Sequence, residues 1–569
     1  MTPAIYADKP WLKQYELMGI PAMEPTPVDT VQPIHQLLDE AARDFPDRTA
    51  TIYRGGEMTY AQLKDKADRL ATALAKLGVV KGDRVGTLML SSPQFGLSLF
   101  GMTKAGAVTQ SISALHKAME IERQLQEAGT KVLITFDDHL DEVLKIRQST
   151  SLEHIIVTSV DDFSAQESPE PRDYPGTLSL RKLIDSHPPQ PPEIDFAPDD
   201  LASVVFTGGA TGVPKGVMFR HSNLTGLLSA FPPMQAMVQP LRGQTSIIVS
   251  LHMFHIGLAS YLMGIAMAAT TAIVPDPRDT KQIYEYIRQL RPMFHLGAPS
   301  QWAKLLALEE ADPDLLKGII PLSGMTMLSP EIEKEYEKKV GTHIGQAYGM
   351  TETSAVITVN LPIFLSKFLG PGALHEEVPI DPTSVGLPTL GTELKIMDMD
   401  KDGKEVPIGE VGEIYVRGPQ VMVGYWPTPG NGLTEDGWLN TGDCGYMNPK
   451  GYLYLTTRTK DMINVSGFKV YGKTVEDAVA GHPGVFAAAA VGVPDINQSG
   501  NERVKLFISL KQGFEATKEI EDEIINMCKE NLAPYSVPRY LEFLDELPMM
   551  HTEKVDKKTL REREEGKGV

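Results

Sequence analysis

Val204–Gly216 reads VVFTGGATGVPKG, a β-branched run that passes into glycines and threonines and ends on a lysine and a glycine. The run predicts a buried strand that ends in a tight loop. A Walker A loop is excluded, because it requires Ser or Thr directly after the lysine, whereas Gly216 follows Lys215 here. Pro214 also directly precedes this lysine. The loop can still hold phosphates, since its glycines admit an anion and Thr207, Thr211 and Lys215 offer hydroxyls and charge. A plain strand-to-turn segment is the alternative.

The segments around this loop alternate between helix and strand patterns from about residue 33 to residue 280. Residues 33–47 and 59–79 have helical periodicity. Strand candidates lie at residues 49–54, 84–90, 107–112, 131–136, 154–159, 202–207, 245–250 and 271–275. This alternation predicts βαβ units and mostly parallel sheets covered by helices.

Two further segments of this region need separate interpretation. Leu258–Val274 is uncharged but short for a membrane span, so we expect a buried helix followed by a buried strand. Ser164–Pro192 is rich in proline and predicts a surface connection.

The pattern changes after about residue 384, where turns rich in Asp, Gly and Pro separate short alternating strands. From about residue 460, strands alternate with helix candidates at Lys473–Ala480 and Lys518–Asn531. The sequence therefore predicts a multidomain α/β protein. Its large N-terminal domain, residues 1–459, would contain mostly parallel sheets and a small β-barrel-like subdomain at about 384–459. A small α+β domain would follow at 460–569.

Composition limits the class of protein. A chain of 569 residues with 42% apolar and 22% charged residues is typical of a multidomain globular protein. Its net charge of −20 argues against a nucleic-acid partner. Cys444 and Cys528 form neither a disulfide framework nor a metal-ligand spacing, which favours the cytoplasm. The first 20 residues lack the basic and apolar regions of a secretory signal.

Five segments together resemble the adenylate-forming superfamily of acyl-CoA synthetases, luciferases and peptide-synthetase adenylation domains. Thr207–Gly216 is similar to its phosphate loop, T-[SG]-G-[ST]-T-G-x-P-K-G. The others are Tyr348–Thr353 (family Y-G-x-T-E), Asn440–Asp443 (T-G-D), Arg458–Gly467 (R-x-K-D-x-I-x-x-x-G) and Leu547–Arg561, which contains the final lysine motif. They follow the family order along almost the whole chain.

The resemblance implies an ATP-dependent acid:CoA ligase. Such an enzyme forms an acyl-adenylate with release of pyrophosphate, then an acyl-CoA with release of AMP. By resemblance, Lys554 would stabilise charge between the carboxylate and the α-phosphate. Thr351 would contact the α-phosphate, and Glu352 would hold Mg²⁺. Asp443 would accept hydrogen bonds from the ribose hydroxyls, and Arg458 would reach the ribose or phosphates.

The remaining positions carried over from the family are binding residues for ATP and CoA. They are Thr207, Gly208, Gly209, Thr211 and Lys215 for the triphosphate, Gly324, Met325, Thr326, Tyr348 and Gly349 around the adenine, and Lys460 and Gly467. Lys460 would be the hinge that makes the C-terminal domain mobile, and Gly467 would approach the pantetheine arm of CoA.

His255 bears on the substrate. Amino-acid-activating relatives have an aspartate at this position, so a histidine favours an acid without an α-amino group. His255 would act at the acid, and a core histidine is the alternative. Gly297–Trp302 and part of Leu258–Ala269 would line an apolar pocket. Because the loop start at Thr207 resembles long-chain fatty acyl members, we expect a medium- to long-chain fatty acid, with an alicyclic or aromatic acid as the alternative.

Two positions depart from the family pattern. Ala210 replaces the usual Ser or Thr, which would cost about 1–2 kcal/mol of phosphate binding if the hydrogen bond is not replaced. Glu553 replaces the glycine before the final lysine. Ala210 makes a non-catalytic binding relative an alternative. A luciferase-like oxidative enzyme is another alternative, which nothing in the sequence favours. The expected partners are ATP, Mg²⁺, CoA and a small acid, without nucleic acid or a transmembrane segment; a peripheral membrane contact and a homodimer are left open.

Overall fold

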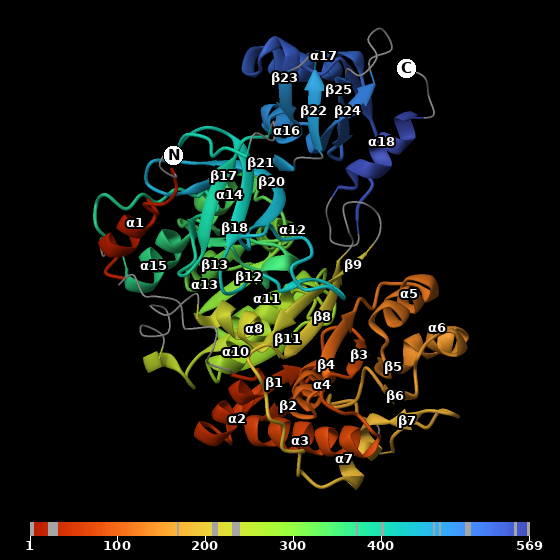
Figure 1. The fold of residues 1–569 in the computed structure, drawn as a ribbon. Helices are drawn as coiled ribbons and strands as arrows, with labels where there is room; N and C mark the ends of the chain where they lie inside the picture. The colour runs from red at the N-terminus through yellow and green to blue at the C-terminus, as the bar shows by residue number, and fades with distance from the viewer. Residues whose placement is uncertain are drawn as a thin grey trace.

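Two large sheets and a set of smaller ones bring distant parts of the chain together (Figure 1). The computed structural model describes residues 5–20, 32–167, 170–207, 214–229, 239–370, 372, 374–399, 403–458, 461–465, 468–494, 502–550 and 555–565.

The first large sheet has the strand order β16-β15-β14-β13-β12-β10-β11-β1-β2 within the described residues. Its strands are β1 (Thr49–Tyr53), β2 (Gly56–Thr59), β10 (Ser246–Val249), β11 (Thr270–Ile273), β12 (Phe294–Gly297), β13 (Ile320–Ser323), β14 (Gly345–Tyr348), β15 (Thr358–Val359) and β16 (Leu387–Pro388). The strands from β14 to β1 pair in parallel. Their carboxyl ends therefore lie along one edge of the sheet, where parallel α/β sheets bind ligands.

The second large sheet has the order β19-β9-β8-β4-β3-β5-β6-β7. Its strands are β3 (Arg84–Leu88), β4 (Val108–Ile112), β5 (Val132–Phe136), β6 (His154–Thr158), β7 (Leu178–Ser179), β8 (Leu201–Thr207), β9 (Lys215–Arg220) and β19 (Gly424–Tyr425). The strands from β8 to β7 run parallel, whereas β9 pairs antiparallel with β8 and with β19. In the sequence, the predicted phosphate-loop segment connects β8, which ends at Thr207, to β9, which begins at Lys215.

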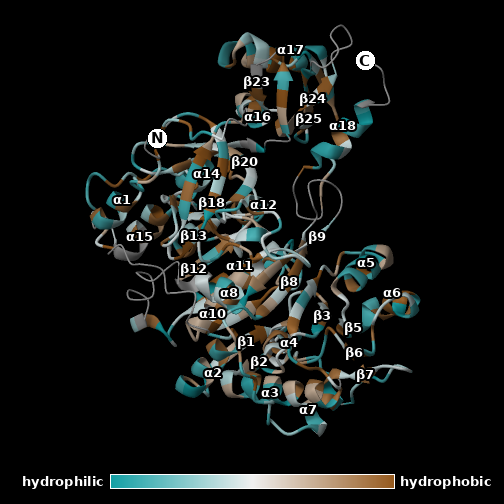
Figure 2. Cartoon of the chain, viewed as in Figure 1, coloured by the Kyte–Doolittle hydropathy of each residue, from teal (hydrophilic) through white to brown (hydrophobic). Residues whose placement is uncertain are grey.

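Helices connect and cover these strands, as the βαβ prediction required. They are α1 (Leu12–Leu17), α2 (His35–Asp44), α3 (Tyr60–Lys76), α4 (Pro93–Lys104), α5 (Ala118–Ala128), α6 (Leu140–Ile146), α7 (Leu180–Ser186), α8 (His221–Ser229), α10 (Gly257–Ala266), α11 (Thr280–Leu290), α12 (Pro299–Ala307), α13 (Pro313–Lys317), α14 (Pro330–Val340) and α15 (Leu361–Leu369). Local sequence fixes α3, because Thr59 and Gln62 form a capping box at its start. Figure 2 shows the sheet strands largely brown and outer helices such as α6 with much teal, which is the pattern expected when one helix face packs on a core.

The C-terminal third confirms the predicted change of architecture. β17 (Glu393–Met397), β18 (Gly412–Arg417), β20 (Leu439–Met447) and β21 (Leu453–Arg458) form an antiparallel sheet. The last part contains β22 (Met462–Val465), β23 (Phe468–Tyr471), β24 (Val485–Pro494), β25 (Glu502–Leu510), β26 (Tyr540–Phe543), α16 (Gly472–Ala480), α17 (Lys518–Asn531) and α18 (Lys557–Glu565). This α+β unit is blue in Figure 1, and its helix α16 lies against β21.

The structure confirms one local prediction and corrects another. Leu258–Val274 holds most of α10 and all of β11, as expected. Ser164–Pro192 is more than a surface connection, because it contains β7 and helix α7, whose Leu180 is fully buried. The prolines around α7 hid its short apolar pattern. Within the described part of the chain, every helix is too short or too polar to cross a bilayer.

His295 on β12 makes stability depend on pH. Its ring is fully buried and contacts Trp302 edge-on at 5.2 Å between ring centroids. Burial lowers the pKa of His295 from its ordinary value of 6.5 to about 4. As the pH falls from 7 to 5, His295 is protonated in the unfolded chain but stays neutral in the folded protein. We therefore expect its contribution to lower the free energy of unfolding by about 2 kcal/mol over this range.

The test is His295→Phe, which keeps an aromatic ring and removes the titrating group. We expect the midpoint of thermal unfolding to fall less between pH 7 and pH 5 in this variant than in the parent. The matched control is exposed His375→Phe, which should retain the parental pH dependence. An unchanged dependence in His295→Phe would contradict the assignment.

Candidate functional site

The carboxyl edge of the first large sheet gathers several segments predicted from sequence. His255 follows β10, Gly297 ends β12, Gly324 follows β13 and Tyr348 ends β14. Since β10, β12, β13 and β14 are successive neighbours in this sheet, their following loops meet at one place. The sequence motifs are therefore brought together by strand order alone.

The segment Gly324–Thr326 lies beside the end of β12. The Gly324 N–H donates to the Gly297 carbonyl at 3.2 Å. Met325 has a φ of 70°, a conformation that L-residues adopt rarely, and the turn continues with the Thr326 N–H donating to the Gly324 carbonyl at 2.9 Å. Gly324 is buried, and a Cβ there would lie 3.5 Å from Leu296 Cδ1, 3.7 Å from the Ala347 carbonyl oxygen and 3.8 Å from Ile256 Cδ1, which are ordinary contacts. The structure therefore gives no steric reason for glycine here, and its place beside the adenine stays a prediction.

A second cluster joins the large sheet to the small antiparallel one. The Tyr348 hydroxyl donates to Asp443 Oδ2 at 2.8 Å, and Arg458 Nε lies 3.2 Å from Asp443 Oδ1. Asp443 and Arg458 are register partners on β20 and β21, which explains why residues from two motifs meet. Burial and the charge of Asp443 raise the pKa of the Tyr348 phenol, so it stays a hydrogen-bond donor at neutral pH.

Glu352 lies in the one-turn 3₁₀ segment Thr351–Thr353 after β14 and is 8% exposed. Its Oε1 accepts a hydrogen bond of 2.9 Å from the Tyr425 hydroxyl, and its main-chain carbonyl accepts one of 2.8 Å from the Met422 N–H. Tyr425 was not among the residues predicted from the sequence. It lies in Gly424-Tyr425-Trp426, within the predicted strand-rich region at about 384–459.

The phosphate-loop residues are partly described. Thr207 ends β8 and is the register partner of Lys215 at the start of β9. The Lys215 ammonium lies 4.7 Å from the centroid of the Tyr425 ring. Predicted positions outside the described residues are Gly208, Gly209, Ala210, Thr211, Lys460, Gly467, Glu553 and Lys554.

At two glycines of the predicted motifs, the protein's own backbone leaves no room for a side chain. At Gly349 a Cβ would lie 2.0 Å from the Ala355 carbonyl oxygen, and at Gly257 one would lie 2.1 Å from the Leu251 carbonyl oxygen. Both positions therefore require glycine for the turns that follow β14 and β10. His255, in the second of these turns, is exposed, so the core-histidine alternative is wrong.

The residues around Glu352 suit a magnesium ion that arrives with a nucleotide. Among the described residues, no group of three or more His, Cys, Asp or Glu side chains could hold a metal by itself. Mg²⁺ needs no such group, because it retains waters and is usually bound by one or two carboxylates together with substrate phosphates. Glu352 is a single buried carboxylate, and its hydrogen-bond donor Tyr425 also contacts the Lys215 ammonium, so it meets that requirement.

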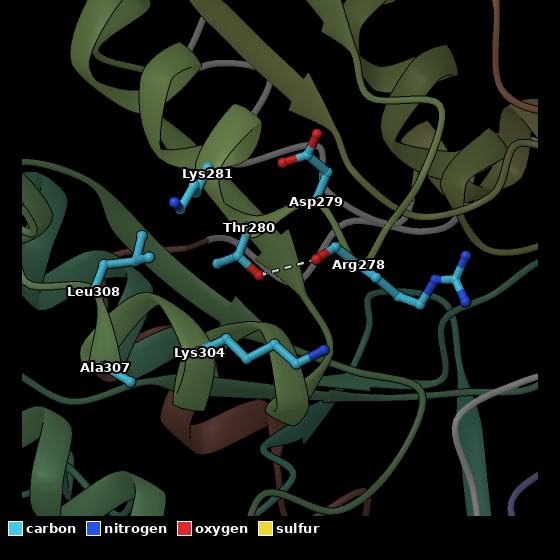
Figure 3. A pocket seen from close by; sticks show the side chains of 7 residues that line it. All are labelled: Arg278, Asp279, Thr280, Lys281, Lys304, Ala307 and Leu308. Carbon is cyan, nitrogen blue, oxygen red and sulfur yellow. Dashed lines mark hydrogen bonds between the residues drawn. The ribbon is translucent and has the colours of Figure 1, made fainter.

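A separate cavity of about 430 Å³ lies at the start of α11 and the end of α12 (Figure 3). It is lined by Arg278, Asp279, Thr280, Lys281, Lys304, Ala307 and Leu308. None of these residues was predicted from the sequence motifs, and the candidate site is a different place in the molecule.

The site contains three charged side chains: the Lys215 ammonium at the start of β9, the buried Glu352 carboxylate and the hydrogen-bonded Asp443 carboxylate. An ammonium can bind phosphate, Glu352 can bind a divalent cation, and Asp443 has acceptor oxygens for a diol. This combination fits a nucleoside triphosphate.

The comparisons with known proteins agree with this geometry. Residues 38–426 match the family model described as AMP-binding enzyme, and residues 474–554 match the one described as AMP-binding enzyme C-terminal domain. The chain is 30% identical to the long-chain-fatty-acid–CoA ligase of Escherichia coli O6:H1, with 98% of this chain and 99% of the relative covered. It is 32% identical to the long-chain-fatty-acid–CoA ligase of Bacillus subtilis strain 168, with 98% of both chains covered.

One solved structure adds a comparison of folds. The crystal structure of an anthranilate CoA ligase in complex with anthranoyl-AMP has a TM-score of 0.79 and 26% sequence identity to this chain. The comparison covers 95% of this chain and 99% of that one. This likeness confirms the predicted multidomain α/β fold with a small C-terminal α+β domain.

Proposed function

The chain belongs to the AMP-binding enzyme family and is an AMP-forming acyl-CoA ligase; we propose that its acid substrate is a medium- to long-chain fatty acid. The observation that carries the substrate proposal is the similarity to two long-chain ligases over almost the full length of the chain.

We propose that the adenylation half-reaction uses the site as follows. The acid carboxylate attacks the α-phosphorus of ATP, and the bond to pyrophosphate breaks. Lys215 binds the leaving phosphates, and Glu352 would hold the Mg²⁺ that neutralises their charge. The Asp443 carboxylate binds the two hydroxyls of the ribose. Tyr348 and Arg458 hold the Asp443 carboxylate in place. Thr351 and Lys554 are proposed to contact the α-phosphate, where negative charge increases in the transition state.

The second half-reaction transfers the acyl group to CoA. The thiolate of CoA attacks the acyl carbonyl carbon, and the carbon–oxygen bond to AMP breaks. We propose that the boundary between the two domains lies at residues 459–460 and that Lys460 is the hinge for rotation of the C-terminal domain. Gly467 would then admit the pantetheine arm, and His255 would stand at the acid, where its exposed position leaves it open to substrate.

A second candidate substrate is an aromatic carboxylic acid. The observation that favours it is the likeness to a ligase whose solved structure holds anthranoyl-AMP. The two candidates differ in the depth of pocket they need, because a chain of many methylenes must enter an extended channel and a ring needs only a short one.

The proposal predicts the products and the ranking of acids. Purified protein with ATP, Mg²⁺ and CoA should form AMP and acyl-CoA in equal amounts, and dodecanoate to hexadecanoate should give a kcat/KM at least about tenfold above benzoate or anthranilate. Each buried methylene contributes about 0.8 kcal/mol, so a long chain gains most in an apolar channel. AMP formation should be measured by chromatography. Preference for a ring acid would overturn the fatty-acid assignment, and no AMP with any acid would overturn catalysis.

We further propose a cytoplasmic location, a peripheral membrane contact through which fatty acid is collected, and a homodimer. The location is supported by Cys444 in β20 and Cys528 in α17, which are both buried and share no disulfide. Flotation with vesicles and sedimentation would test the membrane contact and the dimer.

A further inference from the structure

Tyr425 occupies a position that ties the phosphate loop to the rest of the site. It lies in β19, which pairs antiparallel with β9, the strand that leaves the loop. Tyr425 is the register partner of Val217, and the following Trp426 N–H donates to the Gly216 carbonyl at 2.7 Å. The main chain at Tyr425 is thus fixed to the residues directly after Lys215.

The side chain of Tyr425 contacts two opposite charges. Its hydroxyl donates to Glu352 Oε1 at 2.9 Å, while the Lys215 ammonium lies over its ring at 4.7 Å from the centroid. The described contacts include no ion pair that joins Lys215 directly to Glu352. Tyr425 is therefore in contact with both the cation and the anion.

The position of the ring is itself enforced. Gly432 has a φ of 89°, and a Cβ there would lie 2.4 Å from Tyr425 Cε2. The Tyr425 N–H also donates to the Asn431 carbonyl at 2.9 Å. Because one face of the ring packs on Gly432, its orientation toward Glu352 depends on the absence of a side chain there.

The two contacts of Tyr425 differ in kind. Its hydroxyl donates a hydrogen bond that orients the carboxylate of Glu352. A contact between a cation and an aromatic ring is weaker than a charge-assisted hydrogen bond to phosphate, so Lys215 can leave the ring when a triphosphate binds.

We propose that Tyr425 is a positioning residue for the adenylation half-reaction. It orients Glu352 toward the metal and keeps Lys215 available for the triphosphate. The inference rests on the proposed roles of these two residues in binding Mg²⁺ and ATP. Tyr425 comes from a third segment of the chain, and its side chain contacts neither of the reacting groups.

The first test measures nucleotide binding by calorimetry in the absence of acid substrate. Tyr425→Phe keeps the ring and removes the hydroxyl, so the dissociation constant for Mg·ATP should rise about fivefold to tenfold, whereas binding of ATP without Mg²⁺ should stay within about twofold. Tyr425→Leu also removes the ring and should weaken both. In steady state, Tyr425→Phe should raise the Mg²⁺ concentration for half-maximal rate and the KM for ATP more than it lowers kcat.

Two further variants separate positioning from a general structural defect. Gly432→Ala retains the hydroxyl group but should displace the ring that carries it, so it should weaken Mg·ATP binding in the same direction as Tyr425→Phe. Tyr415→Phe is the matched control, since its hydroxyl contacts Asn440 on the small sheet, and its Mg·ATP binding should equal that of the parent. Circular dichroism and thermal midpoints confirm that each variant is folded.

A double-mutant cycle with Glu352→Gln gives the decisive result. If Tyr425 acts through the Glu352 carboxylate, Tyr425→Phe should have little further effect on Mg·ATP binding in the Glu352→Gln background. Parental Mg·ATP binding by Tyr425→Phe, or full additivity with Glu352→Gln, overturns the inference while the ligase activity stands. Absence of Mg·ATP binding by the parent protein overturns both the inference and the proposed function.

Discussion

Lys554→Ala should lose the adenylation half-reaction and keep the thioesterification half-reaction. An ammonium between the carboxylate and the α-phosphate stabilises charge that develops only as the new bond forms, and loss of one such group typically costs about a hundredfold to a thousandfold in rate. Pyrophosphate exchange into ATP, dependent on acid, should therefore fall by that amount. Formation of acyl-CoA from synthetic acyl-adenylate and CoA should stay within a few-fold of the parent, because the first bond is already made.

The control for this variant is Lys558→Ala. Lys558 is exposed at the start of α18, in the same terminal segment, where it pairs with Glu562 at 3.5 Å. Loss of this surface ion pair should leave both half-reactions unchanged, since such pairs contribute little. Equal damage to both half-reactions in Lys554→Ala would show that the lysine supports folding or domain docking instead of adenylation. Parental pyrophosphate exchange in Lys554→Ala would show that Lys554 takes no part in adenylation.

Asp443→Asn should lower kcat/KM for ATP by about a hundredfold. A charged acceptor contributes roughly 1.5–3 kcal/mol per hydrogen bond, and the change weakens the bonds to both ribose hydroxyls. It also removes the ion pair with Arg458 and replaces the carboxylate that accepts the Tyr348 hydroxyl. The loss should appear mainly in KM, because the ribose does not change during the reaction.

Comparing ATP with a nucleotide that lacks both ribose hydroxyls tests whether the loss comes from the contacts between Asp443 and the ribose. The parent should use 2′,3′-dideoxy-ATP far less well than ATP, whereas Asp443→Asn should discriminate little between the two. Asp436→Asn is the matched control, because Asp436 is an exposed carboxylate in the turn before β20 and accepts from Thr434. If Asp443→Asn still prefers ATP as strongly as the parent, the ribose is bound elsewhere.

Much of the fold could be predicted from the sequence because its strands are short, β-branched and separated by clear helical segments. The predicted helix at Lys518–Asn531 matches α17, and the strand at residues 131–136 matches β5. Helix α7 was missed because proline-rich segments on both sides of it masked seven residues of apolar periodicity. The domain boundaries stay predictions.

The candidate site could be predicted only where a motif names its residues. Tyr348, Asp443 and Arg458 were each expected near the nucleotide, and the structure shows the hydrogen bond and ion pair that join them. Tyr425 could not be found in this way. Its role depends on pairing between β9, which ends at Arg220, and β19, which begins at Gly424. Single-sequence periodicity carries no information on pairing between strands so far apart in the chain.

The most direct test of acyl-adenylate formation follows an oxygen atom. The acid is supplied with ¹⁸O in both carboxylate oxygens, and AMP and pyrophosphate from one turnover with CoA are analysed by mass spectrometry. If the carboxylate attacks the α-phosphorus and the thiol then displaces AMP at the acyl carbon, one ¹⁸O atom should be found in AMP and none in pyrophosphate. Unlabelled AMP together with ¹⁸O in pyrophosphate or inorganic phosphate, or formation of ADP, would contradict the account.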